Sequence, residues 1–337
     1  MAVTIRDVAK QAGVSPATVS MVLNGKHAIS QPTRERVLRA IAQMQYTPNG
    51  RARSFAQKAT HQILFLNELE RNIAYQTPHT FEIMVGMERK LQEKGYSLLL
   101  EHATRGNAAE CVEHWMGGKL ADGVVLHASV ISKRLAAAVA KSGYPHVVIG
   151  QPAFESQVCW IDTNHQLAGE VAAQHLLHQG YRKIAFLGVK EGDRISQMRF
   201  LGFCRVLEAQ EMNVPPQLIG RGDATYHEGI RMTRKLLDQH EPIDAILCAS
   251  NPVALGCLTC LQSMDVLVPQ DVGLMTFDNY PFPLLSNPQL TVVDINMYDM
   301  GKKIGSFIVD KIKKPSLQTQ SFTTLPELLV RESTRKA

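Results

Sequence analysis

The sequence predicts an α/β protein that carries a small all-helical domain at its N-terminus. Apolar residues recur at helical spacing through roughly the first 45 residues. From residue 63 onward, short apolar runs typical of buried strands alternate with amphipathic stretches of helical length. Such an alternation predicts parallel sheets with helices on both faces. A chain of 337 residues, 45% of them hydrophobic, is long enough for two or three packed units and a small appendage.

Residues 4–24 are expected to form a helix, a tight turn and a second helix. The first helix has one apolar stripe, made by Ile5, Val8, Ala9 and Ala12. Gly13 permits the turn, Ser15 can cap the second helix, and Pro16 falls in its first turn. The second helix has a predicted buried stripe of Val19, Val22 and Leu23 and an outer face of Ala17, Thr18, Ser20 and Met21. That outer face suits a helix in a DNA major groove, although an ordinary hairpin with a polar surface fits the same residues.

A third helix is expected to begin after Ser30 and to complete a three-helix core. Its apolar positions are Val37, Ala40, Ile41 and Met44. The run from Tyr46 to Asn49 ends this helix, and Asn49 can cap a short fourth helix that reaches about Lys58.

Charge is distributed unevenly. Residues 1–60 hold nine Lys and Arg against Asp7 and Glu35, a net charge of +7, whereas the remainder has a net charge of −2. A basic arm on a near-neutral body is typical of polyanion binding. The caps and helical periodicity of this arm argue against a targeting peptide, and no apolar run has the length of a membrane span. We therefore expect a cytoplasmic protein.

The chain has six cysteines, and Cys257 and Cys260 have the spacing of a redox pair or half a zinc site. They lie within a helical run at 253–261, and no second pair of this kind lies nearby. We expect them to be buried apolar residues.

The body is expected to contain two successive βα units. The predicted strands are 63–66, 97–100, 123–126, 146–149, 184–188, 218–220, 245–249 and 272–277. The predicted helices are 80–94, 107–117, 132–142, 164–179, 196–212, 226–239 and 252–264. Two doubly wound units of this size resemble the periplasmic sugar-binding fold, in which ligands bind between the units at the carboxyl ends of the strands.

Several motifs resemble those of the LacI family of transcription regulators. At the N-terminus the match is Thr4-x-x-Asp7-Val8-Ala9-x-x-Ala12-Gly13-Val14-Ser15-x-x-Thr18-Val19-Ser20-x-Val22-Leu23-Asn24, followed by Tyr46-x-Pro48-Asn49 and Ala52-Arg53-Ser54. Later matches are Trp160-Ile161-Asp162-Thr163-Asn164, His175-Leu176-x-x-x-Gly180-Tyr181, Arg199-x-x-Gly202-Phe203 and Phe277-Asp278-Asn279. The resemblance covers essentially the whole chain.

The resemblance implies a helix-turn-helix headpiece at 1–47, a hinge helix at 48–60 and an effector-binding and dimerisation domain at 61–337. The last domain divides into an N-subdomain (61–161 plus 293–321) and a C-subdomain (162–292 plus 322–337). In the family, two hinge helices pair in the DNA minor groove and insert an apolar wedge, which here is Phe55. Packing of Phe55 against the body is the alternative.

The DNA contacts implied by the resemblance are Thr4, Ser15, Pro16, Ala17, Thr18, Ser20, Met21, Asn24, Tyr46, Asn49, Ala52 and Phe55. Met21 occupies a position that usually carries Arg. Because Met offers only apolar contact to a base edge, we expect a base preference that differs from that of Arg-bearing relatives.

The implied effector contacts are Arg199, Asp278, Ser250, Asn251, Gln151, Asn67 and Thr80. A guanidinium and a carboxylate can bind neighbouring hydroxyls by charge-assisted hydrogen bonds. The alternative is that Arg199 and Asp278 form a salt bridge that braces the sheet edge. Asn251 replaces a usual carboxylate, and Ala224 stands where several relatives place an aromatic ring.

The predicted function is therefore DNA-binding transcription regulation, with repression as the favoured mode. The expected partners are a double-stranded operator, a small polar effector such as a sugar or sugar acid, and a second copy of the chain, with a tetramer left open. A solute-binding protein that is not exported is the alternative. An enzyme is not expected, because the sequence has no nucleophile elbow, P-loop, HExxH motif or zinc quartet, and we predict no cofactor, metal or membrane association.

Overall fold

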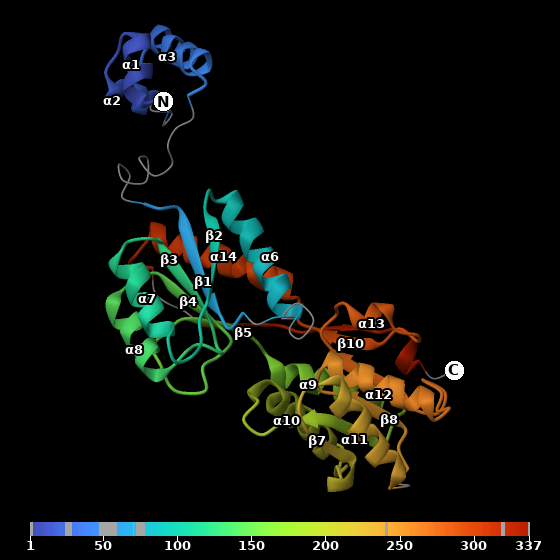
Figure 1. Cartoon of the computed structure of the whole chain (residues 1–337). Helices are drawn as coiled ribbons and strands as arrows, with labels where there is room; N and C mark the ends of the chain where they lie inside the picture. Colours follow the sequence, from blue (N-terminus) through green and yellow to red (C-terminus); the bar gives the residue numbers. More distant parts are fainter. Residues whose placement is uncertain are drawn as a thin grey trace. The chain divides into compact units, whose positions relative to one another are not determined.

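The computed structural model of the chain divides into two compact units, Met1–His61 and Gln62–Ala337 (Figure 1). It describes residues 3–23, 29–46, 59–69, 71, 78–239, 242–317 and 321–335. No helix within these ranges is both long and apolar enough to cross a membrane.

The first unit, the headpiece, is a three-helix core. Its helices are α1 (Ile5–Ala12), α2 (Pro16–Leu23) and α3 (Gln31–Gln43). Their buried side chains are Val8, Ala9, Ala12, Val19, Val22, Val37 and Ala40, with Ile41, Met44 and Tyr46 packed against them. Ser15 Oγ accepts the backbone N–H of Thr18 at 3.1 Å, which confirms Ser15 as the cap of α2. The expected fourth helix lies outside the described residues.

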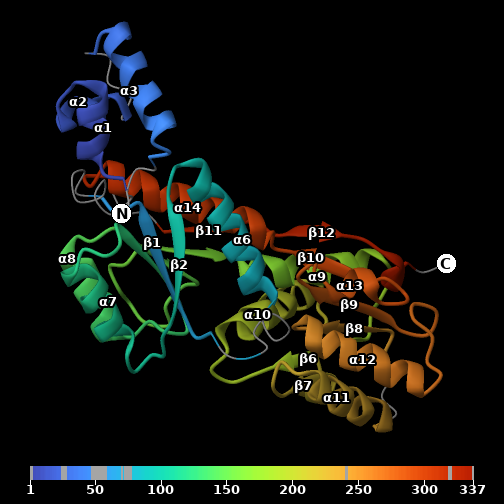
Figure 2. The ribbon, with the colours of Figure 1, turned by 45° about the horizontal axis from the view of Figure 1, so that its top comes forward.

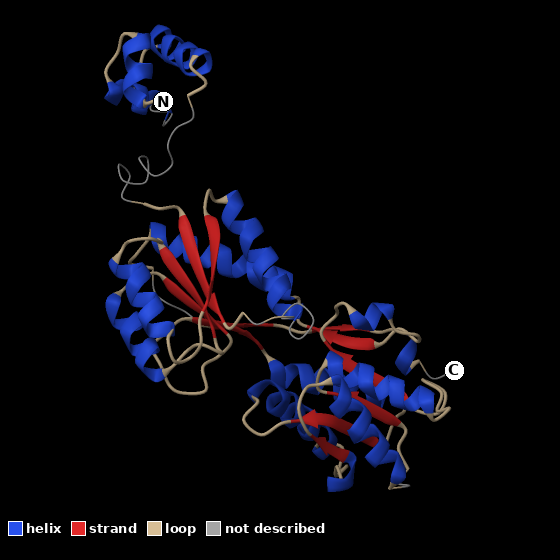
Figure 3. Ribbon diagram, viewed as in Figure 1, coloured by secondary structure: helices blue, strands red, loops and turns tan. Residues whose placement is uncertain are grey.

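The body contains two six-stranded sheets. Sheet A has the strand order β11-β5-β4-β3-β1-β2, and all its neighbouring strands are parallel. Its strands are β1 (Gln62–Asn67), β2 (Ser97–His102), β3 (Gly123–His127), β4 (His146–Ile149), β5 (Trp160–Thr163) and β11 (Phe322–Thr324). Figure 3 shows the strands gathered into two groups, each flanked by helices.

Two pairs of helices cover sheet A. On one face lie α6 (Pro78–Glu93) and α14 (Met297–Lys313), and on the other lie α7 (Ala108–Gly117) and α8 (Lys133–Ser142) (Figure 1). Alternate residues of β1 follow this division. Ile63 and Phe65 pack with α6 and α14, whereas Leu64 and Leu66 pack with α7 and α8. Every strand residue from Ile63 to Leu66 is therefore buried, as its apolar run predicts.

Sheet B has the order β12-β10-β9-β8-β6-β7. Its strands are β6 (Ile184–Val189), β7 (Ile219–Arg221), β8 (Ala245–Cys248), β9 (Gly273–Phe277), β10 (Thr291–Asp294) and β12 (Glu327–Leu329). The paired strands run parallel except β12, which is antiparallel to β10. One face is covered by α9 (His165–His178) and α10 (Arg194–Glu208), and the other by α11 (Tyr226–Asp238) and α12 (Asn251–Ser263) (Figure 2). The short helix α13 (Phe282–Leu285) follows β9.

The chain passes between the two sheets three times. It leaves sheet A after β5, returns to it after β10, and crosses again between β11 and β12. Each sheet is therefore assembled from separate stretches of sequence. β5 continues sheet A to Thr163, β10 continues sheet B to Asp294 and β11 continues sheet A to Thr324. Each crossing therefore comes two or three residues after the subdomain bounds at 161, 292 and 321 that the resemblance implied.

The helix expected at 196–212 differs from the observed α10, which ends at Glu208. The chain then turns through Glu211, whose φ is +58°, and the backbone N–H of Met212 bonds to Leu207 O at 2.9 Å. A glutamate in the left-handed region ends the helix here. Because glycine is the usual residue at such an ending, a glutamate there does not predict the end of a helix.

Paired helices approach each other closely through reciprocal glycines. A Cβ on Gly169 of α9 would lie 2.0 Å from the carbonyl oxygen of Arg199, and one on Gly202 of α10 would lie 2.0 Å from that of Gln166. The same arrangement joins α11 to α12 through Gly229 and Gly256. These contacts bring backbones together to a distance that no larger residue allows.

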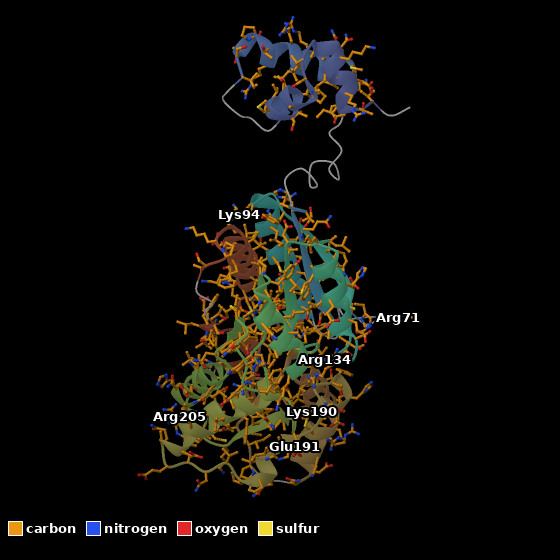
Figure 4. All side chains as sticks on the ribbon, turned by 90° about the vertical axis from the view of Figure 1, so that its left-hand side faces the viewer. Arg71, Lys94, Arg134, Lys190, Glu191 and Arg205 are labelled. Carbon is orange, nitrogen blue, oxygen red and sulfur yellow. The ribbon has the colours of Figure 1, made fainter. Side chains whose placement is uncertain are left out.

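Charged side chains lie mainly on the surface (Figure 4). Lys190, in the loop after β6, pairs with Asp223 at 2.9 Å, and Arg205 of α10 pairs with Glu170 of α9 at 3.2 Å. Exposed pairs of this kind contribute about 0–1 kcal/mol to stability. Arg199 is the exception among the described arginines, since only 2% of its surface is exposed.

Candidate functional site

Arg199 and Asp278 form a buried ion pair. Arg199 Nη2 lies 3.1 Å from Asp278 Oδ1, and Nη1 lies 3.4 Å from Oδ2. Arg199 Nη1 also donates to the carbonyl oxygen of Ala249 at 2.7 Å. The guanidinium carbon sits 4.3 Å from the centre of the Phe277 ring, a cation–π contact. Three groups, the Asp278 carboxylate, the Ala249 carbonyl and the Phe277 ring, therefore hold the position of this side chain.

Local structure explains why these two side chains meet. Arg199 lies on α10, which is held against α9 by the contact between Gly169 and the Arg199 carbonyl. Asp278 follows β9 directly and has a φ of +68°, a left-handed conformation that aspartate tolerates better than most residues. Its backbone N–H donates to Val293 O of β10 at 3.0 Å, which fixes the turn.

Ser250 and Asn251 lie beside this pair. Asn251 begins α12, and its Nδ2 donates to the carbonyl oxygens of Asp278 and Tyr280, both at 2.9 Å. An amide there can use both hydrogens, whereas a carboxylate would face two carbonyl oxygens. The two carbonyl oxygens therefore favour an amide over a carboxylate at this position. We call Arg199, Ser250, Asn251, Asp278 and Tyr280 the sheet-B cluster.

Several polar atoms of the sheet-B cluster are buried without a hydrogen bond to described residues. They are Arg199 Nε, Ser250 Oγ, Asn251 Oδ1 and Tyr280 Oη. Burial also raises the pKa of the Tyr280 hydroxyl, with the negative charge of Asp278 acting in the same direction. Each unsatisfied buried group costs about 1–3 kcal/mol. Buried polar groups normally have a partner, so several without one in the same place call for an explanation, and a bound ligand would provide one.

A second group of polar residues lies at the carboxyl ends of β1 and β3. Asn67 ends β1, His127 ends β3, and Ser129 donates from Oγ to Asn67 Oδ1 at 3.3 Å. Thr80 and His79 lie in the first turn of α6, and Thr80 is buried. We call Asn67, His79, Thr80, His127 and Ser129 the sheet-A cluster.

Charged groups of the sheet-B cluster affect the pKa of His79 in the sheet-A cluster. Burial lowers the pKa of His79, while Asp278 raises it and Arg199 and His165 lower it further. These charges lie close enough to His79 to shift its titration. Burial likewise lowers the pKa of His127 to about 4, with His79 acting in the same direction and Asp162 against it. Both imidazoles are therefore neutral at pH 7.

Gln151 belongs to a third set of contacts, between sheet A and α10. Its backbone N–H donates to Asp162 Oδ2 at 2.9 Å, and its Oε1 accepts Arg194 Nη2 at 2.6 Å. Asp162 also lies 3.2 Å from His165 Nε2. Burial alone would raise the pKa of Asp162, but the hydrogen bonds from His165, Gln151 and Thr163 lower it below its usual value.

The structure thus brings four predicted effector residues together in the sheet-B cluster, Arg199, Ser250, Asn251 and Asp278. Asn67 and Thr80 lie in the sheet-A cluster, and Gln151 contacts Asp162 and Arg194. The sequence reasoning missed His79, His127, Arg194 and Tyr280. His79 and His127 stand at the end of a helix or strand, which is the one sequence signal that could have identified them.

An open surface hollow of about 500 Å³ lies elsewhere, over α11, and its lining includes His227, Arg231 and Arg234. Arg231 there is paired with Glu228 at 2.6 Å. No predicted effector residue lines this hollow. Ala224, which precedes α11, is exposed, and the Tyr226 ring lies edge-on to His227.

Of the predicted DNA-contacting residues that the structure describes, Thr4 precedes α1, Tyr46 follows α3, Ser15 caps α2, and five lie on α2 itself, Pro16, Ala17, Thr18, Ser20 and Met21. Thr4 precedes α1 and donates from its backbone N–H and its hydroxyl to Asp7 Oδ2, at 2.9 and 2.7 Å. Ser15, Pro16 and Ala17 are exposed, whereas Thr18, Ser20, Met21 and Tyr46 are half-buried. Asn24, Asn49, Ala52 and Phe55 lie outside the described residues.

The six cysteines are free thiols. Cys257 and Cys260 are buried in the core on α12, which confirms that this pair is part of the packing. Within the described ranges, no group of three or more His, Cys, Asp or Glu side chains is arranged to hold a metal ion.

Models of known protein families match residues in both units of the chain. Residues 4–49 match the family model described as bacterial regulatory proteins, lacI family, and residues 173–334 match a periplasmic binding protein-like domain. The chain is 30% identical to the HTH-type transcriptional regulator CelR of Thermobifida fusca over 332 residues, which cover 98% of both chains.

Two solved structures resemble the whole chain. The complex of the transcriptional regulator CelR with cellobiose has a TM-score of 0.72 and 29% identity, and the match covers 98% of this chain and 99% of that one. The lac repressor dimer bound to operator and the anti-inducer ONPF has a TM-score of 0.83 and 21% identity, and the match covers 99% of each chain. The second likeness is one of fold.

Proposed function

Because this chain belongs to the LacI family of bacterial regulatory proteins, we propose that it represses transcription as a homodimer under the control of a small polar effector. The effector binds between the sheet-A and sheet-B clusters, and the headpieces bind an operator. The name of the relative CelR, a transcriptional regulator, supports a role that is not enzymatic, and we infer that the chain acts in the cytoplasm.

The main support for the effector site is the set of buried polar atoms around the Arg199–Asp278 pair that have no hydrogen-bond partner among the described residues. A ligand with several hydroxyls can supply partners for Arg199 Nε, Ser250 Oγ and Asn251 Oδ1 after a small opening of the site. Asp278 still has unused lone pairs, since a carboxylate can accept about four hydrogen bonds. Charge-assisted contacts of this kind are about twice as strong as neutral ones.

A sugar is the favoured effector class. The relative CelR, 29% identical over nearly the whole chain in its solved structure, is seen in complex with cellobiose. Asp278 and Arg199 together offer an acceptor and donors to adjacent hydroxyl groups, which is the pattern that vicinal diols require.

DNA binding is supported by the charge and shape of the headpiece. Ser15, Pro16 and Ala17 expose small side chains at the start of α2, where a recognition helix contacts base edges. The Lys and Arg excess in residues 1–60 supplies the attraction to phosphate. One headpiece offers few base contacts. Selectivity therefore requires a dimer that binds the two half-sites of a pseudo-palindrome.

A mobility-shift assay with duplex DNA from the promoter region of the chain's own gene tests the regulator. Binding is expected to be tight at low salt and to weaken steeply as salt increases. A thermal-shift screen of sugars, sugar acids and purines then identifies the effector, since a ligand at 100 times its Kd stabilises by about 2.7 kcal/mol. Absence of any salt-sensitive binding to this DNA would contradict the proposal.

A solute-binding protein that is not exported is the remaining alternative. Such a protein would bind the same sugar but would not need the headpiece. One measurement distinguishes the two functions. A regulator binds DNA with an affinity that changes when the sugar is added, whereas a solute-binding protein shows no such change.

A further inference from the structure

Asn67, at the end of β1, is oriented by two hydrogen bonds. Its Oδ1 accepts the backbone N–H of Glu68 at 2.8 Å and the hydroxyl of Ser129 at 3.3 Å. A backbone N–H can only donate, so the atom that faces it must be the amide oxygen. The free end of Asn67 is therefore Nδ2, a donor for which the described residues provide no acceptor.

His127, on the adjacent strand β3, is held in one tautomer. Its Nδ1 accepts the backbone N–H of Ser129 at 3.2 Å and lies 2.9 Å from Ser129 Oγ. Because Nδ1 faces an obligatory donor, it carries no hydrogen, and the neutral ring must carry its hydrogen on Nε2. Protonation of Nδ1 would break the bond to Ser129, which agrees with a pKa lowered by burial to about 4. The charged or titratable neighbours of this ring are His79 and Asp162.

The sheet-B cluster contributes acceptors, and it also holds donors without a partner among the described residues, Arg199 Nε and the hydroxyls of Ser250 and Tyr280. Asn251 uses both Nδ2 hydrogens on the carbonyl oxygens of Asp278 and Tyr280, so Oδ1 remains as an acceptor. Asp278 adds the spare lone pairs of its carboxylate, and its charge is balanced by Arg199. Two neutral donors thus stand at the ends of β1 and β3, and the acceptors Asn251 Oδ1 and Asp278 stand beside α12 and β9, next to the donor Arg199 Nε.

We propose that His127 and Asn67 determine the specificity of the effector site by selecting a neutral, hydroxyl-bearing ligand. This inference rests on the proposed function. The ligand presents acceptor oxygens to His127 Nε2–H and Asn67 Nδ2–H, and it presents hydroxyl hydrogens to Asp278 and Asn251. The sheet-A cluster therefore sets which sugar derivatives bind, and the sheet-B cluster holds the hydroxyl groups.

The same geometry disfavours charged ligands. A carboxylate or phosphate at the sheet-A cluster would be buried beside neutral donors, and His127 cannot supply a counter-charge without losing its bond to Ser129. Arg199 is already neutralised by Asp278. An ammonium group would face two N–H donors. Sugar acids, sugar phosphates and amino sugars that place their charge there should thus bind more weakly than neutral sugars.

The tautomer can be tested without knowing the effector. Two-dimensional ¹⁵N–¹H spectra of histidine rings in the full chain, with His127 assigned by its absence in His127→Gln, report which nitrogen carries hydrogen. We expect the Nε2–H form at every pH from 5 to 8. A ring that is protonated at pH 6, or that carries its hydrogen on Nδ1, would overturn the proposal.

The selectivity is tested by calorimetry with matched probes, cellobiose with cellobionate and glucose with glucuronate and glucosamine. We expect the neutral member of a set to bind and its charged partners to bind at least about tenfold more weakly. His127→Leu should weaken the neutral sugar about tenfold, the effect of losing one hydrogen bond, whereas His127→Gln should retain most of the affinity through its own N–H.

Three results would overturn the inference: a charged member that binds more tightly than its neutral partner, equal affinities across a set, or a His127→Leu variant that binds like the parent. The variant Asp278→Ala separates this failure from that of the proposed function. If Asp278→Ala abolishes sugar binding and His127→Leu does not, the effector site stands and its selectivity lies elsewhere. If neither variant changes binding, both proposals fail.

Discussion

Arg199 and Asp278 meet although 79 positions separate them, with Nη2 of one 3.1 Å from Oδ1 of the other. The pair joins α10 to the end of β9, and 3% of the Arg199 side chain and 16% of the Asp278 side chain are exposed. A pair buried to this degree affects stability and binding together. Breaking it leaves a charge in a place where water cannot fully solvate it.

The first prediction compares two arginines of the same helix. Arg199→Ala should lower the free energy of unfolding by about 3 kcal/mol, because it leaves the Asp278 carboxylate largely buried and unpaired. Arg205→Ala breaks the pair with Glu170, in which the Arg205 side chain is 69% exposed, and should cost less than about 1 kcal/mol. Urea unfolding of both variants measures the difference. Equal losses would show that the Arg199 pair is no more stabilising than a surface one.

The second prediction separates sensing from DNA binding. Asp278→Asn keeps the shape of the side chain but removes the charge that strengthens its hydrogen bonds. We expect at least about tenfold weaker binding of the sugar found in the screen. Affinity for operator without the sugar should stay at the parent's value, so the variant should repress whether or not an inducing sugar is present. Calorimetry and mobility-shift assays measure the two affinities, and an unchanged sugar affinity would place the effector elsewhere.

The third prediction concerns the helix contact that positions Arg199. In Gly202→Ala, the added Cβ would lie 2.0 Å from Gln166 O and 3.0 Å from Glu170 N, so α9 and α10 must separate. We expect a loss of stability of roughly 1–3 kcal/mol or more. Gly117→Ala is the matched control, since nothing lies within 4 Å of its Cβ and its φ is not positive. Thermal unfolding should show the control at or above the parent's Tm.

The resemblance and the apolar pattern predicted most of the fold. Among the elements that they did not predict are the strands β5, β11 and β12, for reasons that lie in their length and composition. The strand β5 has Asp162 in its centre, and β11 and β12 span three residues each, so none is a continuous apolar run. These strands are set by pairing with β4, β5 and β10 rather than by their own composition. Short strands with mixed residues carry too little periodicity to be recognised.

The candidate site was predictable in part. The resemblance named Arg199 and Asp278, but their contact depends on the fold and cannot be derived from residues so far apart. His79 and His127 were missed because histidine has no sequence signature of its own. Their importance arises from burial and from neighbours such as Ser129, which only the folded structure brings within hydrogen-bond distance.

The fourth prediction concerns acid stability. The His127 ring has a pKa of about 4 in the folded chain and an ordinary value of 6.5 when unfolded. Between these pH values the unfolded chain binds a proton that the folded chain does not, so stability falls as the pH falls from 6.5 to 4. The total loss from this residue is about 3 kcal/mol. The side chain of His127→Gln does not titrate, so this loss should be absent from the variant. As the pH falls from 7 to 4, the parent should therefore lose about 3 kcal/mol of stability relative to the variant. A difference that is constant between pH 7 and pH 4 would contradict the lowered pKa.

The last prediction concerns operator reading by Met21, which lies on α2 and is half-buried. Methionine offers a base only apolar contact, whereas arginine can donate two hydrogen bonds to the O6 and N7 atoms of guanine. Met21→Arg should therefore shift selected DNA sequences towards guanine at one position in each half-site, by about 1–3 kcal/mol of discrimination. Added positive charge alone would raise affinity for every sequence. Met264→Arg controls for this, because Met264 lies in the body and is 42% exposed. Selection from random duplexes with the parent and both variants measures the preference. If Met21→Arg and Met264→Arg enrich the same sequences as the parent, the outer face of α2 does not contact base edges at this position.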